Sequence, residues 1–311
     1  MTGVEDRLGR LVAERLTARA DVEAVLGVVR AATPVVAGVE VVRLSREYEG
    51  VSDLVRERGI DTIIHADRPW VRSRRGGSGS VLNVINTMQL AAAASHRAAS
   101  VRAVVMVSST RVYPVSSRAA RLHPESEPLS PRRGSLAASL VEAEGYVRDL
   151  ATTNPNLSAS IIRLADLADL ADLADLSDLA VRRTHDPLSE LLASPVVPTV
   201  WGFDPSVQLL HIDDAVAALE HAADHDLAGV YNVGADELVR WRQAIRLARK
   251  PHVELPATAT RTLTGILQRA YRVTAGDDLV NELKFGRVAA TEAIARTGFR
   301  PTRTSVHCIP V

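Results

Sequence analysis

Three residues with hydroxyl side chains, Ser108, Ser109 and Thr110, stand directly after a short apolar stretch, residues 104–107. Three valines and a methionine in that stretch predict a strand that is buried on both faces, as at the centre of a parallel sheet. Hydroxyl groups at the carboxyl end of such a strand lie where open α/β sheets bind their ligands. The sequence therefore predicts a ligand site at the end of this strand.

The segments around this strand resemble one protein family. Residues 101–113 read V-R-A-V-V-M-V-S-S-T-R-V-Y, residues 83–90 read N-V-I-N-T-M-Q-L, and residues 207–215 read V-Q-L-L-H-I-D-D-A. With these segments the chain resembles the extended short-chain dehydrogenase/reductase family, the NAD-dependent epimerase/dehydratases, and more narrowly their actinobacterial members.

The resemblance implies an α/β fold in two domains. A Rossmann-like doubly wound parallel sheet would take residues 1–163, and a smaller mixed α/β domain would take residues 164–311 and close over a cleft beside Ser109. Only two residues precede Gly3, whereas the first strand of such a sheet needs about five. We therefore expect that strand to be missing or truncated, either because translation starts further upstream or because the sheet lacks its middle member.

The resemblance also implies an NAD or NADP site. Gly3 and Gly9 match the outer glycines of the family's T-G-x-x-G-x-x-G turn, whose glycines let the backbone approach the cofactor pyrophosphate at a helix N-terminus. Asp6 replaces the middle glycine, and its carboxylate would face two phosphate charges. The alternative interpretation is that this segment only begins a helix and has no phosphate role.

Other strand ends and one helix supply the remaining cofactor contacts that the resemblance implies. Arg30 stands where an NAD enzyme of this fold keeps an acidic residue. It could meet the 2′-phosphate of NADP, or it could be a solvated arginine at a strand end. The full set of expected cofactor-binding residues is Gly3, Gly9, Arg30, Ala66, Asn83 and Ser108.

The family's catalytic pair is missing from the sequence. In the family a Ser or Thr, here Ser109, works with Tyr-x-x-x-Lys, in which the ammonium lowers the pKa of the phenol from about 10 so that it can act as a base. Alignment on Glu144 places Leu136 and Leu140 at these two positions, and a register shifted by two supplies no Tyr or Lys either. None of the five tyrosines has a lysine four residues further on. Ser109 is therefore a candidate catalytic residue for which the sequence lacks the family's Tyr and Lys.

Composition limits the partners and the compartment. The 37 basic and 37 acidic side chains cancel, so no overall field attracts nucleic acid or an anionic membrane. A single cysteine, Cys308, excludes intramolecular disulfides and thiolate metal clusters, and we expect no metal site. The sequence contains no apolar run close to the roughly 20 residues that span a bilayer and no signal-peptide pattern at its start. These features predict a cytoplasmic protein.

Residues 165–179 form a three-residue repeat, A-D-L-A-D-L-A-D-L-A-D-L-S-D-L. A period of three drifts around an α-helix by about 60° per repeat, so neither the leucines nor the aspartates stay on one face. We predict a helical or disordered insert in the second domain rather than a ligand site.

Two functions from different classes remain. The first is an NAD(P)-dependent epimerase, dehydratase or reductase that acts on a sugar-like or small hydroxylated substrate, with a base that no motif identifies. The second is a pseudoenzyme, a scaffold that binds a small-molecule ligand or a partner protein and catalyses nothing. Family resemblance favours the first and the missing residues favour the second, which we prefer; a homodimer is compatible with either.

Overall fold

The computed structural model describes residues 1–29, 36–45, 47–68, 79–119, 121–168, 186–257 and 277–309. Arg30 and the repeat residues 169–179 lie outside these ranges. The chain divides into two compact units. Unit 1 consists of Met1–Ser109, Pro131–Arg163 and Val216–Tyr231, and unit 2 consists of Thr110–Ser130, Leu164–Ala215 and Asn232–Val311.

The main sheet is parallel and of the Rossmann type. Its four-stranded part has the order β10 (Gly229–Val233), β5 (Ser158–Leu164), β4 (Ala103–Ser109) and β3 (Thr62–His65), and a further pair joins β1 (Val25–Val29) to β2 (Val39–Arg43). Every residue of β4 is buried. This confirms the prediction of a central strand that ends in Ser108 and Ser109.

Met1 and Thr2 lie between the two parts of this sheet, with β1 on one side and β3 on the other. The carbonyl of Met1 accepts a hydrogen bond from Val28 N at 2.8 Å on β1, and Thr2 N donates to Ile64 O at 3.0 Å on β3. Thr2 also forms an isolated parallel bridge with His65. Met1 and Thr2 therefore lie at the position of the expected first strand and pair with a neighbour on each side.

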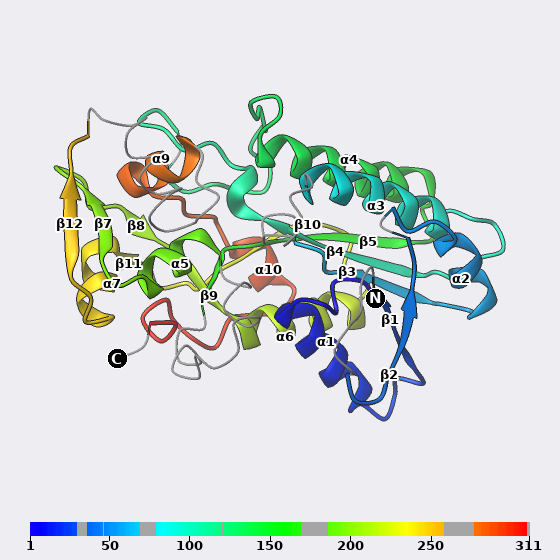
Figure 1. Ribbon diagram of the computed structural model, residues 1–311. Coiled ribbons are helices and arrows are strands. Elements are labelled where there is room, and N and C mark those ends of the chain that lie inside the picture. Colours follow the sequence, from blue (N-terminus) through cyan, green and yellow to red (C-terminus); the bar gives the residue numbers. More distant parts are fainter. Residues whose placement is uncertain are drawn as a thin grey trace. The chain divides into compact units, whose positions relative to one another are not determined.

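Helices cover both faces of the sheet in unit 1 (Figure 1). One face carries α2 (Val51–Glu57), α3 (Gly79–Ala94) and α4 (Leu136–Thr153), and the other carries α1 (Arg7–Thr17) with the unit 1 part of α6 (Ile212–Asp224). The alternating side chains of β1 show why both faces need cover. Leu26 and Val28 pack in the core beneath α2 to α4, while Val25 and Val29 pack with residues of α1.

Unit 2 is built from short strand pairs and helices around its own core. The pairs are β6 (Asp166–Ala168) with β9 (Leu209–His211), β7 (Val197–Val200) with β12 (His252–Leu255), and β8 (Ser206–Val207) with β11 (Val239–Arg240). The helices are η1 (Thr110–Val112), α5 (Pro187–Ala193), α7 (Trp241–Leu247), α9 (Asp277–Phe285) and α10 (Glu292–Arg296). Trp241 lies in this core, and its indole N–H donates to Pro198 O at 3.1 Å.

The start of the A-D-L repeat corrects one prediction. Residues Asp166–Ala168 form the buried strand β6, paired in parallel with β9. The expectation of a helical or disordered insert is therefore wrong for this part, because the neighbouring strand supplies backbone partners that the repeat period does not reveal.

Within the described ranges, no helix has both the length and the apolar character that a bilayer span requires. In the same ranges, no three His, Cys, Asp or Glu side chains are grouped so that they could hold a metal ion.

Candidate functional site

The turn from Gly3 to Gly9 is held tightly against the end of β3. Gly3 has a φ of 76°, and a Cβ on it would lie 2.5 Å from the carbonyl carbon and oxygen of Ala66. A Cβ on Gly9 would lie 2.2 Å from Gly3 O. Both glycines are therefore required by the backbone, and the structure brings together three of the predicted cofactor residues, Gly3, Gly9 and Ala66.

Asp6 provides the negative charge at the start of α1. Its Oδ1 accepts a hydrogen bond from Arg7 N at 2.7 Å, and its Oδ2 pairs with Arg68 Nε at 2.5 Å. The side chain of Arg68 is 1% exposed and that of Asp6 is 13% exposed. The N-terminus of a helix carries a partial positive charge that attracts anions, so in this structure the protein supplies that anion itself.

The side chains of Asp67 and His65, which are close to Arg68 in the sequence, also form hydrogen bonds within the protein. Tyr48 donates its hydroxyl hydrogen bond to Asp67 at 2.6 Å, and both side chains are buried. The ring of His65 contacts the Thr2 hydroxyl through Nδ1 at 2.8 Å and the Thr87 hydroxyl through Nε2 at 3.0 Å. His65 thus ties Thr2 to α3.

Two asparagines on α3 stand out because their buried amides have no hydrogen-bond partner in the part of the chain that the structure describes. Asn83 is 3% exposed and Asn86 is fully buried. Neither the amide nitrogen nor the amide oxygen of either side chain has a hydrogen-bond partner among the described residues. Asn83 is a predicted cofactor residue, whereas Asn86 is not among the predicted site residues.

Ser108 belongs to a buried charge cluster around Glu144. Its hydroxyl donates to Glu144 Oε1 at 2.6 Å. Arg163 binds both oxygens of Glu144, at 2.9 and 2.6 Å, and Arg148 adds a contact at 2.6 Å. Glu144 is completely buried. These contacts join β4, α4 and β5, so they stabilise the sheet, while Ser109 lies buried at the strand end next to them.

The positions aligned with Tyr and Lys fall in the first turns of α4. Leu136 is the first residue of that helix, and Ser135 caps it by accepting from Ala138 N at 3.2 Å. Leu140 is fully buried. Tyr146 lies ten residues beyond Leu136, about 15 Å along the helix axis. In the register aligned on Glu144, helix α4 therefore has an apolar side chain at the expected lysine position.

Unit 2 contains a second buried charge cluster that the sequence did not reveal. Arg111 binds both carboxylate oxygens of Asp166, at 2.9 and 2.7 Å, and approaches Glu282 at 3.3 Å. Arg287 contacts the other oxygen of Glu282 at 3.0 Å. Burial would lower the pKa of Arg111, but the charges of Asp166, Glu282 and Asp186 outweigh it and raise that pKa. Burial raises the pKa of Glu282 and lowers the pKa of Arg287.

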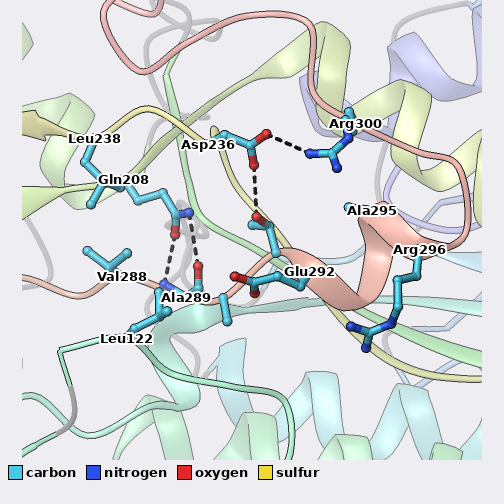
Figure 2. A pocket seen from close by; sticks show the side chains of 12 residues that line it. Leu122, Gln208, Asp236, Leu238, Val288, Ala289, Glu292, Ala295, Arg296 and Arg300 are labelled. Atoms are coloured by element: carbon cyan, nitrogen blue, oxygen red, sulfur yellow. Dashed lines mark hydrogen bonds and ion pairs between the residues drawn. The ribbon is translucent and has the colours of Figure 1, made fainter.

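A groove in unit 2 has a volume of about 580 Å³ (Figure 2). Gln208 in its wall bonds to the backbone of Ala235 and Ala289, and Asp236 accepts from Thr291 at 3.0 Å. The remaining lining residues are Leu122, Leu238, Val288, Ala290, Glu292, Ala295, Arg296 and Arg300. None of the predicted site residues is among those that line this groove.

Comparisons with known proteins identify the family. The sequence model of the NAD dependent epimerase/dehydratase family matches residues 1–234. The chain belongs to this family. Among relatives of this epimerase/dehydratase family member, uncharacterized proteins of Mycobacterium tuberculosis and Mycobacterium bovis are each 33% identical over 272 residues, which cover 86% of this chain and 69% of theirs.

Solved structures share the fold of this family member. A dTDP-glucose 4,6-dehydratase from Bacillus anthracis in complex with NAD has a TM-score of 0.67 at 14% identity, covering 99% of this chain and 94% of its own. A short-chain dehydrogenase/reductase superfamily protein from Agrobacterium tumefaciens with bound NAD has a TM-score of 0.67 at 23% identity, covering 97% and 92%. At these identities the likeness establishes the Rossmann fold alone.

In this family member the backbone of the Gly3–Gly9 turn suits a dinucleotide, whereas the charge of Asp6 opposes one. The glycines keep the tight turn and the close helix packing of a dinucleotide loop. Asp6, however, places a carboxylate at the N-terminus of α1, where such loops receive a pyrophosphate. Like charges repel, and the carboxylate already satisfies the helix dipole. The residues present therefore do not fit a pyrophosphate.

Proposed function

We propose that this member of the epimerase/dehydratase family is catalytically degenerate and acts as a scaffold that binds a metabolite or a partner protein. The observation that carries the proposal is the first part of α4, where Leu136 and the fully buried Leu140 occupy the aligned Tyr and Lys positions. Without a phenol and an ammonium at these positions, the family's proton transfer lacks its usual base. An apolar side chain in the core cannot take over proton transfer.

The proposal includes weak or absent binding of NAD(H) and NADP(H). The carboxylate of Asp6 and its ion pair with Arg68 support this part. Calorimetric titration of the purified chain with each of the four nucleotides is the direct test. We expect no saturable heat in the micromolar range, and a micromolar or tighter dissociation constant for any of them would contradict this part of the proposal.

The second candidate is an active NAD(P)-dependent enzyme on a sugar-like or small hydroxylated substrate. Family membership and the preserved glycine turn favour it. The Ser109→Ala variant separates the two candidates in any turnover that a substrate screen detects. A scaffold with adventitious activity should lose little, since one hydroxyl contributes roughly 1 kcal/mol. A hundredfold loss would show that Ser109 has a catalytic partner and would favour the enzyme.

A further inference from the structure

We infer that Asp6 is an internal counterion that takes the place of a ligand phosphate. This one residue prevents unit 1 from binding ligands that carry a phosphate. The inference rests on the proposed function, because it explains why a family member with the fold of a dinucleotide site would not take a dinucleotide. It also goes further, because it predicts that the anion site is closed by the chain itself and can be opened.

The geometry of the Asp6 carboxylate supports this assignment. One of its oxygens faces the first amide of α1, at 2.7 Å from Arg7 N, and the other faces the guanidinium of Arg68, at 2.5 Å from Nε. A bound phosphate at a helix N-terminus uses the same two kinds of partner, a backbone N–H and an arginine. The carboxylate thus uses the donors that a ligand anion would need.

The surroundings of the ion pair keep these donors in place. Arg68 follows β3 directly after Ala66 and Asp67, and Ala66 is the residue against which Gly3 packs. Tyr48 holds Asp67 through its hydroxyl at 2.6 Å. Because Arg68 is almost fully buried, its charge requires a partner. If the carboxylate of Asp6 is removed, the guanidinium of Arg68 and the first amide of α1 both remain, and both lose this anion.

The experiment compares the natural sequence with Asp6→Gly and Asp6→Asn. Asp6→Gly restores the glycine spacing of the family turn. Asp6→Asn removes the charge but keeps a side chain that caps helices well, so it tests the same idea if the glycine variant does not fold. Asp149→Asn, on the exposed face of α4 in the same unit, is the matched control for the loss of one acidic charge. Circular dichroism first establishes which variants are folded.

The probes are inorganic pyrophosphate and NADH, titrated calorimetrically at low and at physiological salt. We expect both Asp6 variants to bind pyrophosphate about a hundredfold more tightly than the natural sequence, as the removal of one close like charge predicts. The gain should weaken with salt. Adding Arg68→Gln to Asp6→Asn should abolish it, and Asp149→Asn should bind like the natural sequence.

The outcomes separate this inference from the proposed function. If the folded Asp6 variants gain no affinity for either probe, or if the gain survives Arg68→Gln, the inference is overturned while the weak binding of the natural sequence still stands. If the natural sequence itself binds NADH at micromolar concentration, then the proposal of weak cofactor binding fails, and Asp6 does not exclude phosphate.

Discussion

Glu144 in unit 1 and Glu282 in unit 2 are both buried carboxylates, yet their surroundings differ. Both oxygens of Glu144 are shared among Ser108, Arg148 and a bidentate Arg163. Glu282 has Arg287 at 3.0 Å on one oxygen, while the other meets Arg111 only at 3.3 Å, without hydrogen-bond geometry. Burial raises the pKa of Glu282. A buried charge stabilises a fold only when its hydrogen-bonding capacity is filled. The Glu144 cluster therefore stabilises unit 1 at neutral pH, whereas the stability that Glu282 contributes to unit 2 should depend on pH.

Neutralising Glu144 should give the largest effect. Glu144→Gln leaves Arg163 buried opposite an uncharged amide, and breaking such a pair typically costs about 3 to 5 kcal/mol. Urea unfolding at pH 7 measures the loss. Glu142→Gln, on the exposed face of the same helix, is the control and should change the free energy of unfolding by less than about 0.5 kcal/mol. Equal effects for the two variants would show that the Glu144 cluster does not stabilise unit 1.

Removing the hydroxyl from the same cluster should give a smaller loss. Ser108→Ala takes away the bond of 2.6 Å to Glu144 but keeps both arginines. Hydrogen bonds to charged groups contribute about 1.5 to 3 kcal/mol, so we expect a loss near 2 kcal/mol in the same urea measurement. In the Glu144→Gln background the serine substitution should cost much less, because the two residues act together. Full additivity would contradict the described network.

Glu282→Gln should cost less again, about 1 kcal/mol at pH 7, because the ionised carboxylate is only half satisfied. Its pH dependence provides the sharper test. The raised pKa means that the folded state binds the proton more tightly than the unfolded state, whose pKa is about 4.3. The proton-linked part of the contribution of Glu282 to stability is therefore fully present below that pH and is lost as the pH rises through the folded-state pKa. What remains at pH 7 is the contact with Arg287.

The measurement is the free energy of unfolding of both proteins between pH 4 and pH 8. The natural sequence should lose stability relative to Glu282→Gln as the pH rises from about 4.3. A difference that stays constant across this range, or one of the opposite sign, would mean that Glu282 is as well satisfied as Glu144 and would remove the contrast between the units.

The sequence predicted elements that local patterns determine. The apolar residues of β4 are visible without a structure, and the missing Tyr-x-x-x-Lys is a plain fact of the sequence. The glycine positions were also predicted, and the structure adds the collisions that make them necessary. These features depend on neighbours in the sequence, so a reading of the chain can find them.

The charge clusters could not be predicted, because their members are far apart in the chain. Asp6 and Arg68 are separated by 62 positions, and Arg111 and Asp166 by 55. Asp166 illustrates the difficulty further, since in the sequence it is one of several identical repeat aspartates. Only the pairing of β6 with β9 buries it and brings it to Arg111. No local period distinguishes such a residue from a solvated one.

Asn86→Ala extends the comparison to a buried amide whose hydrogen-bonding capacity is unfilled among the described residues. Of the four substitutions it should change the free energy of unfolding least, and it should raise it. The variant removes a desolvated amide that has no partner among the described residues and adds the helix preference of alanine over asparagine, while the lost volume works against it. We expect a gain of about 1 kcal/mol or less in urea unfolding. Gln89→Ala, on the same helix and half-buried, is the control for helix preference. A loss of more than about 1 kcal/mol relative to that control would mean that bound water or a ligand satisfies the Asn86 amide, and α3 would then become the leading place to look for the molecule that this scaffold binds.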